Sequence, residues 1–173
     1  MRDIIETKRL VLRPVAQTDW KPLVNYAGDI NVARATARLP HPYSYADAQN
    51  WIELTQVPNE NHIYGIALKA AHLIGCVSLT AKESTWELGY WLGQPHWHKG
   101  YVREASSALL DEARRHLAPA DLCACVFIDN PRSLALLQYL GFSLCGQCTE
   151  FCVARGHDVE AHKLSLSLEV HHA

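Results

Sequence analysis

The chain has 173 residues, of which 49% are hydrophobic and 20% charged, and its formal net charge at pH 7 is −2. These values are typical of one globular domain with a real core, and they exclude a disordered chain or a general attraction to nucleic acid. No run approaches the ~18 apolar residues of a membrane-spanning helix. The opening MRDIIETKRL lacks the apolar stretch of a secretory signal. We therefore expect a cytoplasmic protein that binds neither a membrane nor nucleic acid.

Periodicity predicts one strand and two helices in the first third of the chain. Residues 9–13 carry two leucines on one face of an alternating pattern, as a strand does. Thr18 can cap a helix that starts at Asp19, whose carboxylate suits the positive end of a helix. Ser44 is the expected cap of a second helix.

The middle of the chain predicts strands and then a helix. Residues 63–68 and 73–80 are rich in β-formers and are joined by a short polar turn, which indicates a hairpin. Residues 86–92 form another expected strand. From Gly100 onward, apolar residues recur at steps of three and four, which predicts an amphipathic helix.

The last third continues the alternation of strands and helices. Residues 122–128 form an apolar strand, and Asn130 with the proline after it starts a helix that ends at Gly141. Residues 142–153 and 164–170 are expected strands. This order of elements predicts a mixed α/β sheet with helices on its faces.

Six cysteines raise the question of a metal site. Cys145 and Cys148 form a CxxC pair, with Cys152 and His157 nearby. Strand alternation would point Cys145 away from Cys148 and Cys152, and no second CxxC completes a tetrahedral set. We expect no metal, and thiols that are buried or half-buried.

The segment QPHWHKGYVREA, residues 94–105, places a basic loop around Gly100 directly before a helix. The start of a helix offers unpaired N–H groups and the positive end of its dipole, which together bind phosphate. Lys99 and Arg103 add positive charge. Alternatively, Gly100 only relieves a tight turn and the basic residues face solvent. Both interpretations are compatible with this segment.

Four segments in order resemble the GCN5-related N-acetyltransferases, most closely the branch with the ribosomal-protein N-terminal acetyltransferases. They are ETKRLVLRP (residues 6–14), ELGYWLGQPHWHKGYVREA (87–105), DNPRSLALLQYLGF (129–142) and RGHDVEAHKLSLS (155–167). The family's loop pattern, Gln/Arg-x-x-Gly-x-Gly/Ala, falls on residues 97–102. Trp97 and Val102 depart from it. A helical φ would let Val102 point into the core, whereas an unusual φ would weaken phosphate binding.

The resemblance implies one N-acetyltransferase domain over residues 1–173. Its fold would be a single mixed, mostly antiparallel sheet with a V-shaped splay between strands 4 and 5 and helices on both faces. The splay would separate residues 90–92 from residues 126–128.

The resemblance also implies acetyl-CoA as co-substrate and no metal. The pantetheine arm would pair with the splayed strand, and a backbone N–H there would stabilise the thioester oxyanion. The expected cofactor-binding residues are Tyr90, Trp91, Leu92, Trp97, His98, Lys99, Gly100, Tyr101, Val102, Arg103, Asn130 and Ser133.

Acetyl transfer to an amine needs a base, because an amine with a pKa of about 8–10 is mostly protonated at pH 7. Glu87 is the candidate base, although a carboxylate at that position could instead sit in an ion pair. Many family members carry a tyrosine acid where this chain has Leu137. Tyr139 lies roughly 200° further round a helix and cannot replace it. Ser133 is therefore the candidate proton donor to the sulfur of coenzyme A.

These residues favour an acetyl-CoA-dependent N-acetyltransferase that acts by direct attack in a ternary complex, as a monomer or homodimer. The acceptor would be a primary amine, either a protein N-terminal α-amine or a small molecule such as an amino acid, polyamine or antibiotic. Leu137 and Val102 also keep open a catalytically idle acyl-CoA-binding module.

Overall fold

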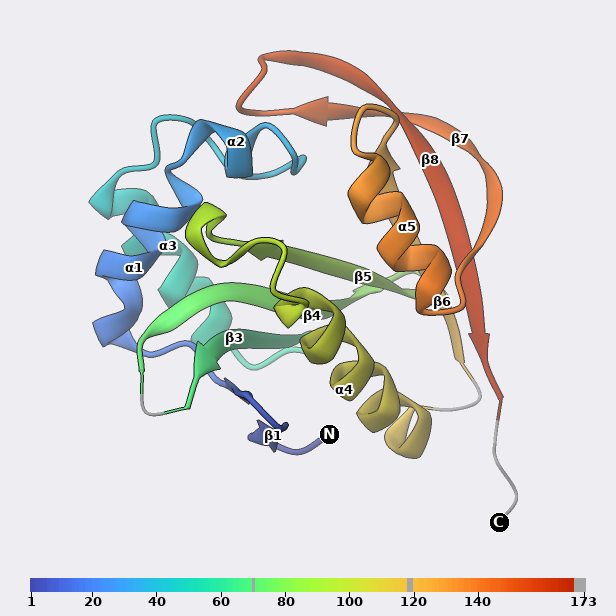
Figure 1. Ribbon diagram of the computed structural model, residues 1–173, viewed down its shortest axis with the longest axis horizontal. Helices are drawn as coiled ribbons and strands as arrows, with labels where there is room; N and C mark the ends of the chain where they lie inside the picture. Colours follow the sequence, from blue (N-terminus) through green and yellow to red (C-terminus); the bar gives the residue numbers. More distant parts are fainter. Residues whose placement is uncertain (70, 118–119, 170–173) are drawn as a thin grey trace.

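One eight-stranded sheet organises the computed structural model, which describes residues 1–69, 71–117 and 120–169 (Figure 1). Its strand order is β1-β2-β3-β4-β5-β6-β8-β7, and all neighbours are antiparallel except β5 and β6. The strands are β1 (Ile5–Glu6), β2 (Leu10–Arg13), β3 (His62–Leu68), β4 (Leu73–Lys82), β5 (Thr85–Leu92), β6 (Ala120–Phe127), β7 (Ser143–Cys152) and β8 (His157–Leu168). The predicted mixed α/β sheet is confirmed.

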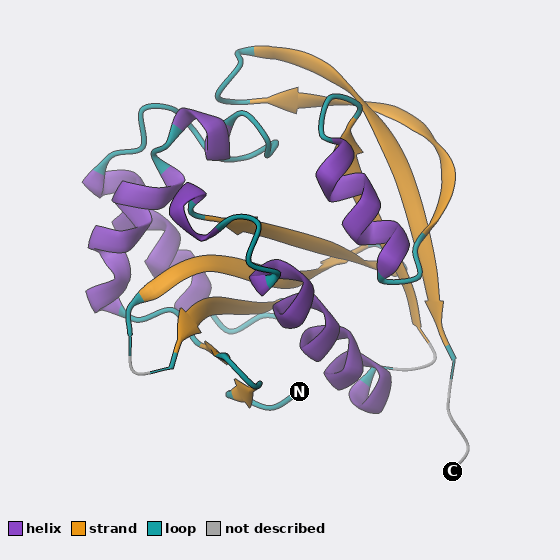
Figure 2. Ribbon diagram, viewed as in Figure 1, coloured by secondary structure: helices purple, strands orange, loops and turns teal. Residues whose placement is uncertain are grey.

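Helices cover both faces of this sheet (Figure 2). They are α1 (Trp20–Ala27), α2 (Ile30–Ala33), α3 (Tyr45–Gln56), α4 (Tyr101–His116) and α5 (Pro131–Tyr139), with short 3₁₀ turns at Gln17–Asp19 and Gln94–His96. None of the helices in the described part of the chain is long and apolar enough to cross a membrane.

Two hydrophobic clusters lie on opposite faces of the sheet. The larger one joins α4 and α5 to the sheet, and Tyr90 of β5 packs against it. The second one joins α1 and α3 to the opposite face, and Trp91 of β5 packs against that. Neighbouring residues of one strand thus point into different layers, as the two-residue period of a strand requires.

The predicted helix starts are confirmed at Ser44 and Asn130. Ser44 Oγ accepts from the backbone N–H of Asp47 at 3.1 Å, and Asn130 Oδ1 accepts from that of Ser133 at 3.1 Å. The predicted hairpin of β3 and β4 is also confirmed. Of the predicted last strand, β8 ends at Leu168, and position 170 lies outside the described residues.

The predicted cap at Thr18 is wrong. A 3₁₀ turn over Gln17–Asp19 precedes α1, which begins at Trp20, and neither element has Thr18 as its cap. The buried Asp19 carboxylate explains the difference. It accepts from the backbone N–H of Ala16 at 2.8 Å and pairs with Arg13 of β2 at 2.7 Å. A contact with a neighbouring strand therefore decides the path of the chain here.

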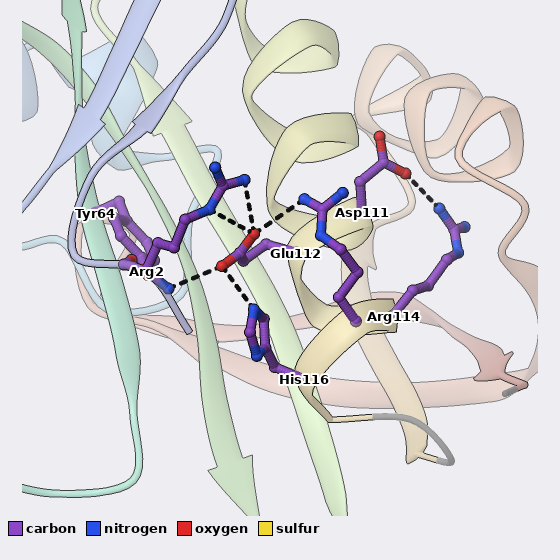
Figure 3. Close-up of polar contacts among 7 residues, drawn as sticks. Arg2, Tyr64, Asp111, Glu112, Arg114 and His116 are labelled. Carbon is purple, nitrogen blue, oxygen red and sulfur yellow. Dashed lines mark hydrogen bonds and ion pairs between the residues drawn. The ribbon is translucent and has the colours of Figure 1, made fainter. Parts of the chain in front are cut away.

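A buried carboxylate on α4 ties the N-terminus to the domain (Figure 3). The Glu112 side chain is 0% exposed and accepts from the backbone N–H and guanidinium of Arg2 at 2.8–3.0 Å. Arg115 and His116 lie 2.9 and 3.0 Å from it. The hydrogen bonds from Arg2 are the main reason why the pKa of Glu112 falls to about 2, against the opposing effect of burial.

We expect Glu112→Gln to lower the free energy of unfolding by about 2 kcal/mol at pH 7, because charge-assisted hydrogen bonds to a buried group are lost. Urea denaturation measures this change. The matched control is Asp111→Asn on the same helix. Asp111 is 59% exposed and pairs with Arg114 at 2.8 Å, so its loss should cost less than about 0.5 kcal/mol.

The same pair of proteins tests the pH dependence. A carboxyl whose pKa is depressed in the folded state stabilises the protein above its unfolded pKa of 4.5, and this contribution is lost as pH falls toward about 2. Acidification through this range should therefore destabilise the wild type more steeply than Glu112→Gln. Parallel pH profiles of the two proteins would contradict the assignment.

Candidate active site

The site begins where β5 and β6 separate. These strands pair only at Trp86 with Leu122 and at Glu87 with Cys123, and then diverge (Figure 1). The V-shaped splay expected from the family resemblance is confirmed. The strands expected as the fourth and fifth are β5 and β6, because the two-residue β1 was not counted in the expectation. Beyond Glu87, the edge of β5 that faces β6 has no partner strand. Its N–H and C=O groups are available to an extended ligand.

The loop between β5 and α4 depends on two left-handed residues. Gly100 has φ +75° and His98 has φ +62°. A Cβ at Gly100 would meet only the far ends of two flexible side chains, Arg9 at 3.5 Å and Arg103 at 4.0 Å, so the positive φ and not crowding is the reason for glycine. The first turn of α4 then presents N–H groups that have no partner in their own helix. The unusual conformation of His98 has no signal in the sequence.

Side-chain hydrogen bonds hold this loop in position. Trp97 Nε1 donates to the Leu92 carbonyl at 2.7 Å, which joins the loop to the end of β5. Arg9 donates to the Lys99 carbonyl at 2.8 Å. Val102 lies in α4 without a positive φ and packs against the core, so its bulk does not strain the turn.

A cavity of about 410 Å³ lies beside the loop. Eleven of the twelve residues expected to bind the cofactor line it, and the exception is Lys99. The Lys99 ammonium donates instead to the Pro95 carbonyl at 2.9 Å. Arg132, which sequence reasoning missed, and His96, which it did not count among the expected residues, also line this cavity. Burial lowers the pKa of His96, with a smaller effect from Lys99, so the positive charge in this cavity comes mainly from arginine.

A second cavity of about 290 Å³ is lined by residues 87–91 of β5 and by residues of β4 and β6. Its lining includes Glu87, Trp51, Arg38 and Lys82. The two cavities share Ala35, Thr36, Tyr90, Trp91 and Ser133. They therefore meet at the splay, where a group held in one can reach a group held in the other.

The Glu87 carboxylate is 18% exposed and lies between two cations. Arg38 is 3.1 Å from it and Lys82 is 3.6 Å from it. The ion-pair environment considered for Glu87 is thus present, and the carboxylate also lines the second cavity. The two features are compatible, because a paired carboxylate can still accept a proton through water.

Ser133 and Tyr90 form a hydroxyl pair where the cavities meet. Their oxygens are 2.6 Å apart. Burial raises the pKa of Tyr90 to about 12, so its phenol is protonated at neutral pH. Sequence reasoning had treated Tyr90 as a backbone contact or a core residue. Nothing in the spacing of positions 90 and 133 indicates that their side chains meet.

A core residue occupies the position of the missing tyrosine, because Leu137 is buried at 1% exposure. Tyr139 is 65% exposed and lies under the guanidinium of Arg103, 5.1 Å from its ring centre. Tyr139 is not among the described residues that line either cavity, which agrees with the expectation that it does not replace the missing tyrosine.

The cysteines differ from expectation in one respect. Cys145 is exposed rather than buried or half-buried, because a register shift between Leu144 and Gly146 displaces it from the β7–β8 ladder. Cys148 instead faces Cys125 of β6, with 3.8 Å between their sulfur atoms.

Comparisons with known proteins agree with this geometry. A family model described as an acetyltransferase (GNAT) domain matches residues 9–143. The uncharacterized N-acetyltransferase p20 of Bacillus licheniformis is 25% identical in an alignment 174 residues long, gaps included, that covers 95% of this chain and 96% of that protein.

Two solved structures illustrate the fold. RimL, a ribosomal L7/L12 alpha-N-protein acetyltransferase in complex with coenzyme A, has a TM-score of 0.83 at 17% identity, covering 96% of this chain and 98% of that chain. The spermidine N-acetyltransferase of Vibrio cholerae, in complex with CoA and spermine, has a TM-score of 0.78 at 19% identity, covering 94% and 97%. Because the family model spans more than half of the sequence, the chain belongs to the GNAT family of acetyltransferases.

Proposed function

We propose that this acetyltransferase transfers the acetyl group of acetyl-CoA directly to a primary amine within a ternary complex. The observation that carries the proposal is the meeting of two cavities at the splay, one beside the Gly100 loop and one beside Glu87. When bound, acetyl-CoA supplies an activated acetyl group as a thioester. Direct transfer needs two sites that open onto one point, and the shared lining at Tyr90 and Ser133 supports that requirement.

The residues of the first cavity fit the co-substrate. The left-handed Gly100 and the first turn of α4 suit a diphosphate, since backbone N–H groups and the helix dipole both favour negative charge. Arg103 and Arg132 add two cations to the lining. The free edge of β5 suits the amide-containing pantetheine arm, because it offers hydrogen bonds like those of a neighbouring strand.

Glu87 is proposed as the base. It accepts a proton from the acceptor ammonium, directly or through a water molecule, so that the neutral amine can attack. Arg38 and Lys82 hold the carboxylate on the wall of the second cavity.

Ser133 is proposed as the acid, with Tyr90 behind it. The Ser133 hydroxyl donates a proton to the sulfur of coenzyme A as the thiolate leaves. The Tyr90 phenol, 2.6 Å away and protonated at neutral pH, donates to Ser133 Oγ. Asn130 holds the backbone of Ser133 by accepting from its N–H.

The acceptor is proposed to be a protein N-terminal α-amine or a small-molecule amine. RimL and the spermidine N-acetyltransferase represent these two classes among the structural neighbours. The second cavity supports both, because Glu87 and Glu150 can attract a cationic amine and Trp51 provides an apolar wall. Pooled peptides and pooled small amines, assayed separately for free thiol release, distinguish the classes.

Gly100→Ala should weaken binding of coenzyme A by about tenfold, because an L side chain at positive φ strains the phosphate turn by roughly 1–2 kcal/mol. Isothermal titration calorimetry measures the affinity. Gly156→Ala is the matched control. Gly156 has φ +70° and open space around it, so it carries a similar backbone strain outside both cavity linings. Equal losses of affinity in the two variants would contradict a role for the Gly100 turn.

Glu87→Gln should lower kcat by about 10²–10³-fold, because the amide cannot take a proton from the acceptor. Affinity for acetyl-CoA should be unchanged. Glu53→Gln, at an exposed carboxylate of α3, is the control and should retain full activity. Unaltered thiol release in Glu87→Gln would rule out this base. Cofactor binding by the wild type without turnover on any amine would instead indicate an idle acyl-CoA-binding module.

Ser133→Ala should lower kcat by about 10²-fold through loss of the proton donor, and Tyr90→Phe by about tenfold through loss of one hydrogen bond. The double variant should be no slower than Ser133→Ala, because the phenol acts through the serine. Tyr139→Phe, on the exposed side of α5, should have wild-type kcat. Fully additive losses would show that the two hydroxyls act independently.

A further inference from the structure

Three side chains from distant parts of the sequence converge beside the second cavity. They are Cys125 of β6 and Cys148 and Glu150 of β7, and all three are half-buried. Their ligand atoms, two sulfurs and a carboxylate oxygen, lie within 4.8 Å of one another. The function proposed above uses neither thiol, and it gives Glu150 only a part in attracting a cationic amine to the second cavity.

The sheet register explains the convergence. β8 lies between β6 and β7, and Ala161 of β8 pairs with Cys148 on one side and with Phe127 on the other. Ala161 is fully buried, and its small side chain leaves room above β8. Directly opposed residues share a face of a sheet, so Cys148, Ala161 and Phe127 lie on one face. Cys125 is two residues before Phe127 on the same strand and therefore lies on that face too. Cys148 and Cys125 can thus meet across the intervening strand.

The spacing matches a tetrahedral metal site. Two thiolates that bind one zinc ion at about 2.3 Å lie about 3.8 Å apart in tetrahedral geometry. The two sulfur atoms here are 3.8 Å apart. Glu150 supplies an oxygen as the third ligand, and three protein ligands leave one position open.

The charges around the thiols also favour a cation. Glu150 belongs to the cluster and Glu87 lines the same cavity as Cys125, so two carboxylates lie near the thiols. A divalent ion would stabilise both thiolates as it binds, and two protons would be released to solvent.

We propose that Cys125, Cys148 and Glu150 form a binding site for a thiophilic divalent cation such as Zn²⁺, with its open coordination position toward the second cavity. Cys125 and Glu150 line that cavity together with Glu87. A bound ion would occupy space that the acceptor needs. The ion is therefore an inhibitor of acetyl transfer and not a participant in it, and this consequence rests on the proposed function.

The test uses Co²⁺ as a spectroscopic probe on the reduced full-length protein under anaerobic conditions. We expect a thiolate-to-cobalt charge-transfer band in the near ultraviolet that saturates at one ion per chain and is bleached by Zn²⁺. Glu150→Gln should weaken Co²⁺ binding by at least about tenfold. Cys125→Ser and Cys148→Ser should each lose the band or reduce it to that of a single thiolate.

Each cysteine variant has a control on its own strand. Cys123→Ser on β6 and Cys145→Ser on β7 should keep the full band, because neither sulfur belongs to the cluster. Absence of the band in the wild type would overturn the proposal. A band that survives in both Cys125→Ser and Cys148→Ser would also overturn it. Coenzyme A binding by each variant reports whether the fold is retained, and Glu150→Gln provides a test that alters no thiol.

Inhibition kinetics separate this proposal from the proposed function. We expect Zn²⁺ to raise KM for the amine without raising KM for acetyl-CoA, and this effect should vanish in Cys148→Ser. A cobalt band without any acetyl transfer would support the metal site and overturn the proposed function. Transfer that Zn²⁺ does not inhibit, despite a wild-type cobalt band, would overturn the blocking role.

Discussion

The parting of β5 from β6 is the constraint on which the rest of the molecule depends. Two residue pairs, Trp86 with Leu122 and Glu87 with Cys123, hold these strands together in the described part of the chain, and beyond Glu87 each strand has an edge without its neighbour. Buried N–H and C=O groups left in this way are costly unless something pairs with them. A ligand that supplies those partners is bound by the backbone itself. The two cavities meet at this gap, and residues of β5 and α5 belong to the lining of both.

The gap is useful only if α4 stays in place, and the N-terminal segment fixes that helix at two points. Near its start, Glu104 accepts from Thr7 at 2.6 Å and pairs with Arg9 at 2.6 Å. Two turns later, Glu112 is held by Arg2. Hydrogen bonds from the N-terminal segment outweigh burial and lower the pKa of both carboxyls. The end of α4 that carries the proposed phosphate site is thereby coupled to the stability of the chain's first residues.

Much of the fold could be predicted from the sequence because its elements have clear local periods. Residues close together in the sequence determine the apolar face of α4, the β3–β4 hairpin and the helix caps at Ser44 and Asn130. The predicted helix cap at Thr18 is wrong because Asp19 forms an ion pair with Arg13 of β2. No local sequence pattern indicates this tertiary contact. The loop residues could be found because they are contiguous and resemble a family motif. The contact of Tyr90 with Ser133 and that of Cys125 with Cys148 depend on sheet register, so the sequence could not predict them.

The meeting of the two cavities beside β5 is what the proposed ternary complex depends on. Glu87 lines the second cavity, whereas Tyr90 and Ser133 line both cavities, and Tyr90 also packs against the core beneath α4 and α5. In the proposed mechanism the proton is removed in the second cavity and delivered where the two cavities meet. In the proposed function, an amine held in the second cavity and a thioester held in the first would meet at the gap, so no acetylated residue would be needed to carry the acetyl group between them.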